Sequence, residues 1–154
     1  TYTAVLRGAN QTQGIGVVEI YDLDLGTDSE LANLAARAFV STGDDVLIGG
    51  LTLSRVTPRR VLLRAIGPSL AGSLANALQN PTMELFNGNG DRLGTNDNWK
   101  DAPNASEIAA TGIAPMNDAE STILIPLGAG QYTAVVSGVD NGTGNGVVEV
   151  YRLD

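Results

Sequence analysis

The sequence predicts an all-β fold, an antiparallel β-sandwich that carries one or two short helical plugs. The first observation is a series of short segments rich in strand-forming residues; the second is that clusters of Gly, Asn, Asp and Pro separate them. Segments that recur every 8–12 residues, roughly, are typical of antiparallel sandwiches and barrels. A length of 154 residues fits one domain. We expect strands at 34–40, 46–53, 60–66, 83–87, 92–95 and 121–125.

Two segments break the strand pattern. Leu70, Leu74 and Leu78 recur at the spacing of one helix face, which predicts a short amphipathic helix or a pair of turns. Residues 106–110 predict a single helical turn, for which Asn104 is a candidate N-cap. We expect both segments to close the ends of the sandwich.

An internal repeat divides the chain. Residues 1–24 and residues 131–154 align without a gap at an offset of 130, and 13 of the 24 positions are identical. We therefore expect a duplicated terminal segment, 1–24, followed by one sandwich module, 25–154. In the first copy the identical positions are Tyr2, Thr3, Ala4, Val5, Gly8, Gly14, Gly16, Val17, Val18, Glu19, Tyr21, Leu23 and Asp24.

Each copy predicts a β-hairpin: a strand-forming run, a glycine-rich connection and a second strand. In the second copy, Val148 and Val150 are expected on one face of the last strand, with Val147 and Glu149 on the other. No Lys-Ser/Thr pair follows the glycines at 142, 144 and 146, which favours a turn over a phosphate-binding loop.

The duplicated segment predicts self-association. It is the tail of a preceding repeat, or it pairs with a sheet edge of a neighbouring molecule, or it folds back on its own sheet. A head-to-tail contact that does not close gives an open fibre. The candidate self-association residues are Tyr2, Val5, Val17, Val18, Tyr21, Tyr132, Val135, Val148 and Tyr151.

The composition narrows the function. The net charge of −8 argues against nucleic acid or an anionic membrane surface as a partner, and no apolar run is long enough to insert into a membrane. The absence of His and Cys removes the usual general base, the commonest zinc ligand and thiol chemistry, so we expect no enzyme.

Asp44, Asp45, Asp118 and Glu120 fall on predicted turns, where we expect them to be solvated. No basic segment followed by an apolar one opens the chain, so any secretion signal is expected to be gone or to lie outside it.

The loop from 87 to 101 carries the candidate ligand sites. Asn87, Asn89 and Asp91 have the spacing of the first calcium-loop ligands, with Asp97 nearby, although Arg92 stands where that loop needs Gly. The alternative is a hairpin turn held by Asx side chains.

Carbohydrate is the second candidate ligand of this loop. Trp99, with Asn96 and Asp97, could stack on and bind a glycan, whereas the alternative places the indole as a lid over the end of the sandwich. Elsewhere, Arg60 and Arg64 share a strand face, where they meet either an anionic partner or the chain's own acids. No other cofactor is expected.

Several segments together resemble a known module: residues 34–50, 60–70, 81–86, 95–99 and 110–115, with the closing Val-Val-Glu-Val-Tyr. They resemble a repeat module of large secreted and cell-surface proteins of environmental bacteria. Residues 81–154 are loosely similar in layout to bacterial pre-peptidase C-terminal domains, which are jelly-roll-like sandwiches. The resemblance implies an extracellular or cell-surface, non-catalytic β module. We expect a structural module that self-associates or repeats in tandem to build a fibre or adhesive stalk; the alternative is a carbohydrate-binding accessory domain.

Overall fold

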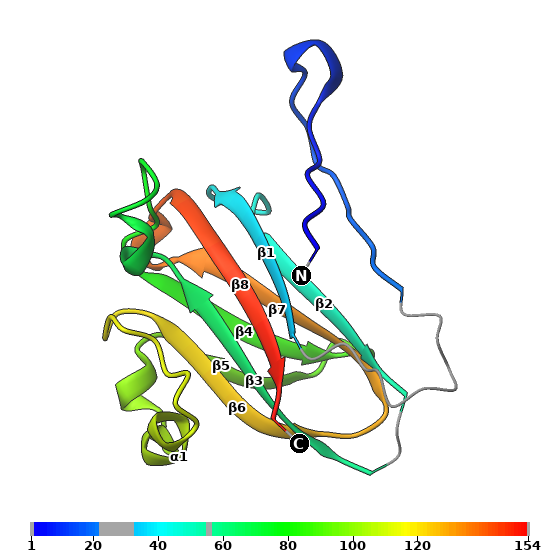
Figure 1. Ribbon diagram of the computed structural model, residues 1–154, viewed down its shortest axis with the longest axis vertical. Coiled ribbons are helices and arrows are strands. Elements are labelled where there is room, and N and C mark those ends of the chain that lie inside the picture. The colour runs from blue at the N-terminus through cyan, green and yellow to red at the C-terminus, as the bar shows by residue number, and fades with distance from the viewer. Residues whose placement is uncertain (1, 22–32, 55–56, 154) are drawn as a thin grey trace. The chain divides into compact units, whose positions relative to one another are not determined.

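The computed structural model describes residues 2–21, 33–54 and 57–153, and it divides the chain into two units, Thr1–Leu31 and Ala32–Asp154. Each unit is described by itself. The boundary that the repeat predicts after residue 24 lies outside the described residues. The second unit holds all the strands of the described chain (Figure 1).

The second unit is a sandwich of two antiparallel four-stranded sheets, which confirms the predicted fold class. One sheet has the order β1-β8-β3-β6 and the other the order β2-β7-β4-β5. The strands expected from the sequence are all present, within a few residues of their predicted bounds. They are β1 (Asn33–Val40), β2 (Leu47–Leu53), β3 (Arg59–Ile66), β4 (Pro81–Asn87), β5 (Arg92–Asn96), β6 (Ser121–Leu127), β7 (Gly130–Gly138) and β8 (Gly144–Arg152).

The strand pairs are nested. β4 pairs with β5, β3 with β6, β2 with β7 and β1 with β8, so each outer pair encloses the inner ones along the chain. Two sheets of four strands connected in this way form a jelly roll. As a result β7 lies between β2 and β4, and β8 lies between β1 and β3. Each of the last two strands is therefore an interior strand of its own sheet. The edge strands are β1 and β6 in one sheet and β2 and β5 in the other.

The predicted hairpin of residues 131–154 is wrong. β7 and β8 belong to different sheets and are joined by a 3-10 turn, η4 (Val139–Asn141). We call residues 130–152 the C-terminal arch, because the two strands face each other across the core instead of pairing edge to edge. The alternation of apolar residues identifies each strand but not its partner. β7 forms its hydrogen bonds with β2 and β4, and β8 forms its hydrogen bonds with β1 and β3.

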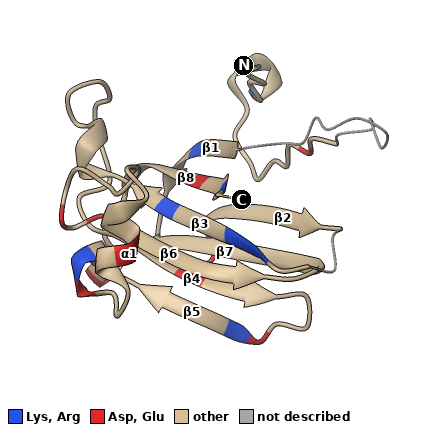
Figure 2. Cartoon of the chain, turned by 60° about the horizontal axis from the view of Figure 1, so that its bottom comes forward, with Lys and Arg blue, Asp and Glu red and all other residues tan. Residues whose placement is uncertain are grey.

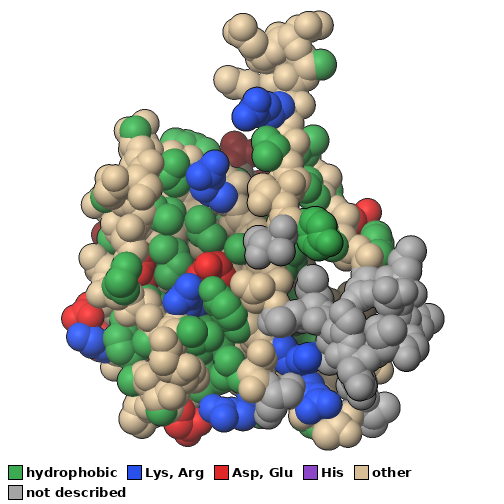
Figure 3. All heavy atoms as spheres, in the orientation of Figure 1, with side chains coloured by type: hydrophobic (Ala, Val, Ile, Leu, Met, Phe, Trp, Pro, Cys, Tyr) green, Lys and Arg blue, Asp and Glu red, His purple; other side chains and the backbone are tan. Residues whose placement is uncertain are grey.

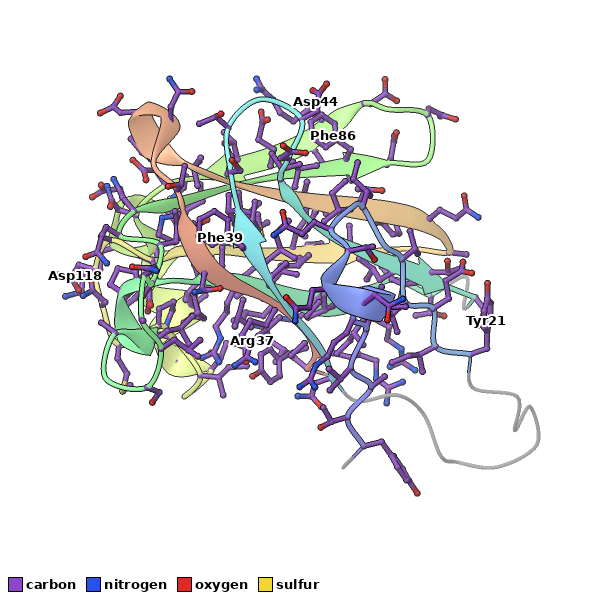
Figure 4. The ribbon with its side chains drawn as sticks, turned by 90° about the horizontal axis from the view of Figure 1, so that it is seen from above. Tyr21, Arg37, Phe39, Asp44, Phe86 and Asp118 are labelled. Atoms are coloured by element: carbon purple, nitrogen blue, oxygen red, sulfur yellow. The ribbon has the colours of Figure 1, made fainter. Side chains whose placement is uncertain are left out.

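The core lies between the sheets. Along β8, Val148 and Val150 point inward while Val147 and Glu149 are half-buried on the outer face, as the alternation predicts. The fully buried side chains between the sheets include Val40, Val61, Leu63, Leu78, Met83, Leu85, Ala134 and Val136. Alternate residues of the edge strand β1, among them Arg37 and Phe39, remain exposed (Figure 4).

A second apolar cluster covers the outer face of β3 and β6. Ile108 of α1 (Ala105–Ala110) packs there on Leu62 and Leu124, beside the 3-10 turn η3 (Trp99–Asp101). The helical turn at 106–110 is thus confirmed, but it covers a sheet face and does not close an end of the sandwich. Asn104 stands at its N-cap, yet its side chain donates to the Leu124 carbonyl at 3.0 Å instead of capping the helix.

The segment around Leu70–Leu78 forms turns and no amphipathic helix. A 3-10 turn, η2 (Pro68–Leu70), continues into further turns that end at the buried Leu78. Gly72 and the left-handed Asn76, with a φ of 55°, interrupt the helical pattern of the leucines. Across the described residues, every helix is too short and too polar to cross a membrane.

The first unit contains one regular element among its described residues, the 3-10 turn η1 (Ala9–Gln11). The residues on either side of this turn are not strands, so the hairpin predicted for the first copy is not formed within residues 2–21. Hydrophobic side chains lie at the surface of this segment (Figure 3).

Candidate functional site

The turns of the two copies have the same backbone conformation. In η1, Asn10 and Gln11 have positive φ angles of 51° and 62°; in η4, Asp140 and Asn141 have 53° and 59°. Two successive residues other than glycine in the left-handed region are uncommon, since only Asn and Asp enter it with ease. The first copy therefore holds the turn of a β-arch.

The contacts within the two turns also agree. The Thr12 amide donates to the Ala9 carbonyl at 3.1 Å, and the Gly142 amide donates to the Val139 carbonyl at 2.9 Å. A Cβ atom on Gly8 would collide with the Thr12 carbonyl, as one on Gly138 would collide with the Gly142 carbonyl. The glycine at this position is thus required by the turn itself in both copies.

The two copies differ in burial. Val136, Val148 and Val150 of the C-terminal arch are at most 9% exposed. Their counterparts in the first copy, Leu6, Val18 and Ile20, are 59%, 52% and 58% exposed. Of the candidate self-association residues, the strongly exposed ones are Tyr2, Val5, Val17, Val18 and Tyr21, whereas Tyr132, Val135, Val148 and Tyr151 are half-buried or buried within the sandwich.

The outer face of β8 carries an ion pair with β3. Arg64 Nε donates to Glu149 Oε2 at 2.8 Å, and Arg64 also donates to the Ile113 carbonyl at 2.6 Å. The guanidinium lies over the Tyr151 ring, 5.1 Å from its centroid. Both charged side chains are mostly buried, so Arg64 pairs within the module, which was one of the two sequence alternatives. Figure 2 shows basic positions on β3 and an acidic position on the neighbouring β8.

The tyrosine of this group has a shifted pKa. Burial, and after it the negative charge of Glu149, raise the pKa of Tyr151 above its ordinary value of 10.0, partly offset by Arg64. Its hydroxyl donates to Glu149 Oε1 at 3.2 Å. The first copy repeats this pair: the Tyr21 hydroxyl donates to Glu19 Oε1 at 3.1 Å, which raises the pKa of the exposed Tyr21.

The start of β8 contacts the turns after η2. A Cβ atom on Gly144 would lie 2.6–2.8 Å from backbone atoms of Leu78, Asn76 and Ala77, so this position accepts only glycine. Asn145 then receives and donates backbone hydrogen bonds, from the Leu78 amide at 2.9 Å and to the Asn76 carbonyl at 2.7 Å. Gly14 is the counterpart of Gly144, and a Cβ there would meet no described atom within 4 Å.

The turn proposed for calcium is held by its own side chains. Asn87 Oδ1 accepts the amides of Asn89 and Asp91, both at 2.9 Å, and Asn87 Nδ2 donates to Asp91 at 2.9 Å. This is the Asx-turn alternative. Asp97 follows the far end of β5, and the described residues contain no group of three or more His, Cys, Asp or Glu that could hold a metal. Calcium binding stays a prediction.

The residues proposed for a glycan take part in the packing of the module. The half-buried Trp99 packs on the cluster around Ile108, with Lys100 Nζ 5.6 Å from its ring centroid. The indole thus takes part in packing, as the lid alternative predicts, but it lies on the outer face of β3 and β6 and not over an end of the sandwich. Asn96 joins the two sheets: its Oδ1 accepts the Thr122 amide at 2.7 Å, and its carbonyl accepts the Ser121 hydroxyl at 2.8 Å. Glycan binding also stays a prediction.

Sequence reasoning missed the role of Glu120. Its side chain is fully buried, which corrects the expectation that it is solvated on a turn. Its carboxylate accepts the amides of Gly67 and Ser69 at 3.1 and 2.9 Å, and the Ser69 hydroxyl at 2.8 Å. Asp44, Asp45 and Asp118 are exposed on turns, as expected (Figure 4). The only signal in the sequence is the position of this acid directly before the predicted strand 121–125.

Comparison with known proteins gives a similarity in structure but none in sequence. No protein-family model matches the chain, and no curated protein matches it. The fold is similar to the pre-peptidase C-terminal domain of a collagenase from Bacillus anthracis, at 12% identity, covering 77% of this chain and 89% of that one with a TM-score of 0.49. The jelly-roll assignment rests on the chain's own two sheets.

Proposed function

We propose that the chain is a non-catalytic structural module of a secreted or cell-surface protein. It self-associates or repeats in tandem to build a fibre or stalk, and residues 1–24 are the connecting segment. The observation that carries this proposal is the shared turn of η1 and η4, which shows that the sequence repeat extends to backbone conformation.

The surface of the N-terminal segment supports association. Eight large hydrophobic side chains between residues 2 and 21 are more than half exposed, a density that soluble monomers avoid unless the surface is a binding site. The sandwich also offers edges for strand addition. Phe39 on β1 and Ile48 on β2 are 54% and 55% exposed along two of them.

The chemistry of the chain supports a role without catalysis. The chain has no His and no Cys, so a neutral-pH general base and a thiol nucleophile are both missing. Ser69 donates its hydroxyl proton to the buried Glu120, within the packing of the 67–69 turn. The remaining carboxylates of the predicted pairs are exposed, with Asp44 and Asp45 on one connection and Asp118 on another.

The test compares chain 1–154 with chain 32–154, which retains both sheets and both apolar clusters. Light-scattering chromatography over a concentration series, with negative-stain microscopy, gives the mass and shape of each. We expect concentration-dependent oligomers from chain 1–154 and monomers from chain 32–154. Monomers from both chains at every concentration would exclude self-association through residues 1–24.

A further inference from the structure

We infer that the N-terminal segment, residues 2–21, is the closing β-arch of a second sandwich of this kind. Its partner is a second copy of the six strands β1–β6, in which it takes the position that β7 and β8 occupy here. The inference rests on the proposed function only in taking residues 1–24 as the connecting segment.

The first argument is that the turn of the arch is already formed. η1 keeps the left-handed pair, the closing hydrogen bond and the constrained glycine of η4, although residues 2–21 form no strand. A turn of this kind directs its two flanking segments into two different sheets. Pairing with a single exposed edge requires only one extended strand and gives no reason for this turn.

The second argument is the inward-facing residues. At an offset of 130, the buried Ala134, Val136, Val148 and Val150 correspond to Ala4, Leu6, Val18 and Ile20. Every one of these counterparts is apolar, and the substitutions keep the volume within one methyl group. They can therefore fill the same space between two sheets.

The third argument is a glycine without a local reason. Gly144 is required because β8 begins against the backbone of Asn76, Ala77 and Leu78. Gly14, its counterpart, is also glycine, although a Cβ atom there would meet no described atom within 4 Å. A second copy of the turns at 76–78 supplies the close backbone that Gly14 fits.

The fourth argument is the outward-facing pair. Glu149 and Tyr151 bind Arg64 of β3. Glu19 and Tyr21 repeat this pair and its internal hydrogen bond, with no described arginine bonded to them. In the second copy, the Arg64 counterpart on β3 would pair with Glu19, which an edge strand beside β1 could not reach because β8 separates β1 from β3.

The partner cannot be a complete module. In each complete sandwich the position is filled by its own residues 130–152, so exchange between complete modules buries no additional surface. Oligomers of chain 1–154 would therefore form by addition to a sheet edge and not by exchange of the arch. A net gain requires six strands that lack their own arch. The experiment therefore supplies them: residues 33–130 are placed a second time directly before Thr1, as residue 130 precedes residue 131 in the natural order. We call this the extended chain.

Cysteine pairs then report the position of the segment, and the natural chain contributes no cysteine. β4 pairs with β7 and β5 and has no free edge, and Glu84 lies opposite Val135 on the outer face. The test variant is Val5→Cys with Glu84→Cys in the added copy, because Val5 is the counterpart of Val135. Directly opposite antiparallel residues lie within disulfide reach. Val135→Cys with Glu84→Cys in the original copy is the positive control, and Ala4→Cys replaces Val5→Cys as the register control.

We expect an intramolecular disulfide between positions 5 and 84 of the added copy, and its loss in the Ala4→Cys control. Mass spectrometry of the digested protein identifies the linked peptides. Absence of this disulfide, while the positive control forms, would overturn the inference. If chain 1–154 still forms oligomers in that case, and Val5→Cys crosslinks instead to Ile48→Cys on the β2 edge of another molecule, the proposed function stands with edge addition as its mechanism. Formation of the disulfide without oligomers of chain 1–154 would support the inference and exclude self-association.

Discussion

Asn10 and Asp140 have the same left-handed backbone conformation, with φ and ψ of 51° and 38° in one and 53° and 38° in the other. Asp140 lies in a turn that joins the two sheets of a complete jelly roll. Asn10 lies in a segment whose described residues form no strand. The turn is thus fixed by local sequence, and its strands gain their burial only from a partner.

A matched pair of substitutions in chain 1–154 distinguishes the contributions of the two copies to the free energy of unfolding. Val148→Asp places a carboxylate in the core and is expected to lower the free energy of unfolding by about 4 kcal/mol or more. Val18→Asp, at the equivalent exposed position, is expected to change it by less than about 0.5 kcal/mol. Urea unfolding followed by the fluorescence of the single tryptophan measures both.

The same pair tests the proposed role in assembly. In our proposal the apolar surface of Val18 contributes to association and not to the core of the sandwich 32–154. Val18→Asp is therefore expected to weaken oligomer formation while the free energy of unfolding is retained. An equal loss of stability in the two variants would contradict the separation of the two units.

The raised pKa of Tyr151 makes stability depend on pH in the alkaline range. The folded state holds the phenol proton more tightly than the unfolded state, in which the pKa is near 10.0. The protonated phenol therefore contributes fully to the free energy of unfolding below a pH of roughly 10. This contribution is lost as the pH rises from there through the pKa of Tyr151 in the folded state. Urea unfolding at a series of pH values from about 8 to about 11 measures how steeply the free energy of unfolding falls with pH.

Tyr151→Phe is the control for this slope. The variant loses two hydrogen bonds of its hydroxyl and starts from a lower stability. Its stability is expected to fall less steeply as the pH rises above about 10, the ordinary pKa of a phenol, because the group that loses its proton is absent. Parallel curves for the two proteins would show that another group causes the alkaline loss.

Glu120→Gln is expected to destabilise the sandwich by about 2–4 kcal/mol, because one side-chain oxygen becomes a donor that faces other donors. Oε1 accepts the amides of Gly67 and Ser69, and Oε2 accepts the Asn117 amide as well as the Ser69 hydroxyl. Either orientation of the glutamine amide therefore places its NH2 group against a backbone N–H. Glu107→Gln, at an exposed position of α1, is the matched control and is expected to leave the stability unchanged. Thermal unfolding of both variants gives the comparison.

Trp99→Ala distinguishes a lid from a glycan platform. Loss of its packing on the cluster around Ile108 is expected to cost about 2 kcal/mol, less than for a fully buried tryptophan. Association of chain 1–154 should persist. A glycan array probed with the wild type and the variant checks the alternative, and a glycan bound by the wild type alone would favour carbohydrate binding through this loop.

Strand positions could be predicted from the sequence because alternation and turn residues are local. The partners of β7 and β8 could not, because an arch and a hairpin have the same local pattern of strand, turn and strand. Only the pairing of Val148 with Ala36 and Ala65, on strands far away in the chain, shows that β8 is an interior strand.

The candidate site was predictable to the same extent. The repeat singled out residues 1–24, and the identical glycines were visible without a structure. The reason for Gly144 was not visible, because it depends on the close approach of Asn76 and Leu78 from another part of the chain. Glu120 was missed for a related reason: an acid before an apolar run looks like a turn residue until its buried donors are known.

The most direct measurement of the central claim is the unfolding of the extended chain with Val18→Asp beside the same chain with Val148→Asp. The account predicts that each substitution abolishes the cooperative transition of one module and leaves the other intact, because Val18 closes the added sandwich as Val148 closes the original one. If Val18→Asp leaves the extended chain unchanged while Val148→Asp does not, residues 2–21 are not a closing arch and the account is contradicted.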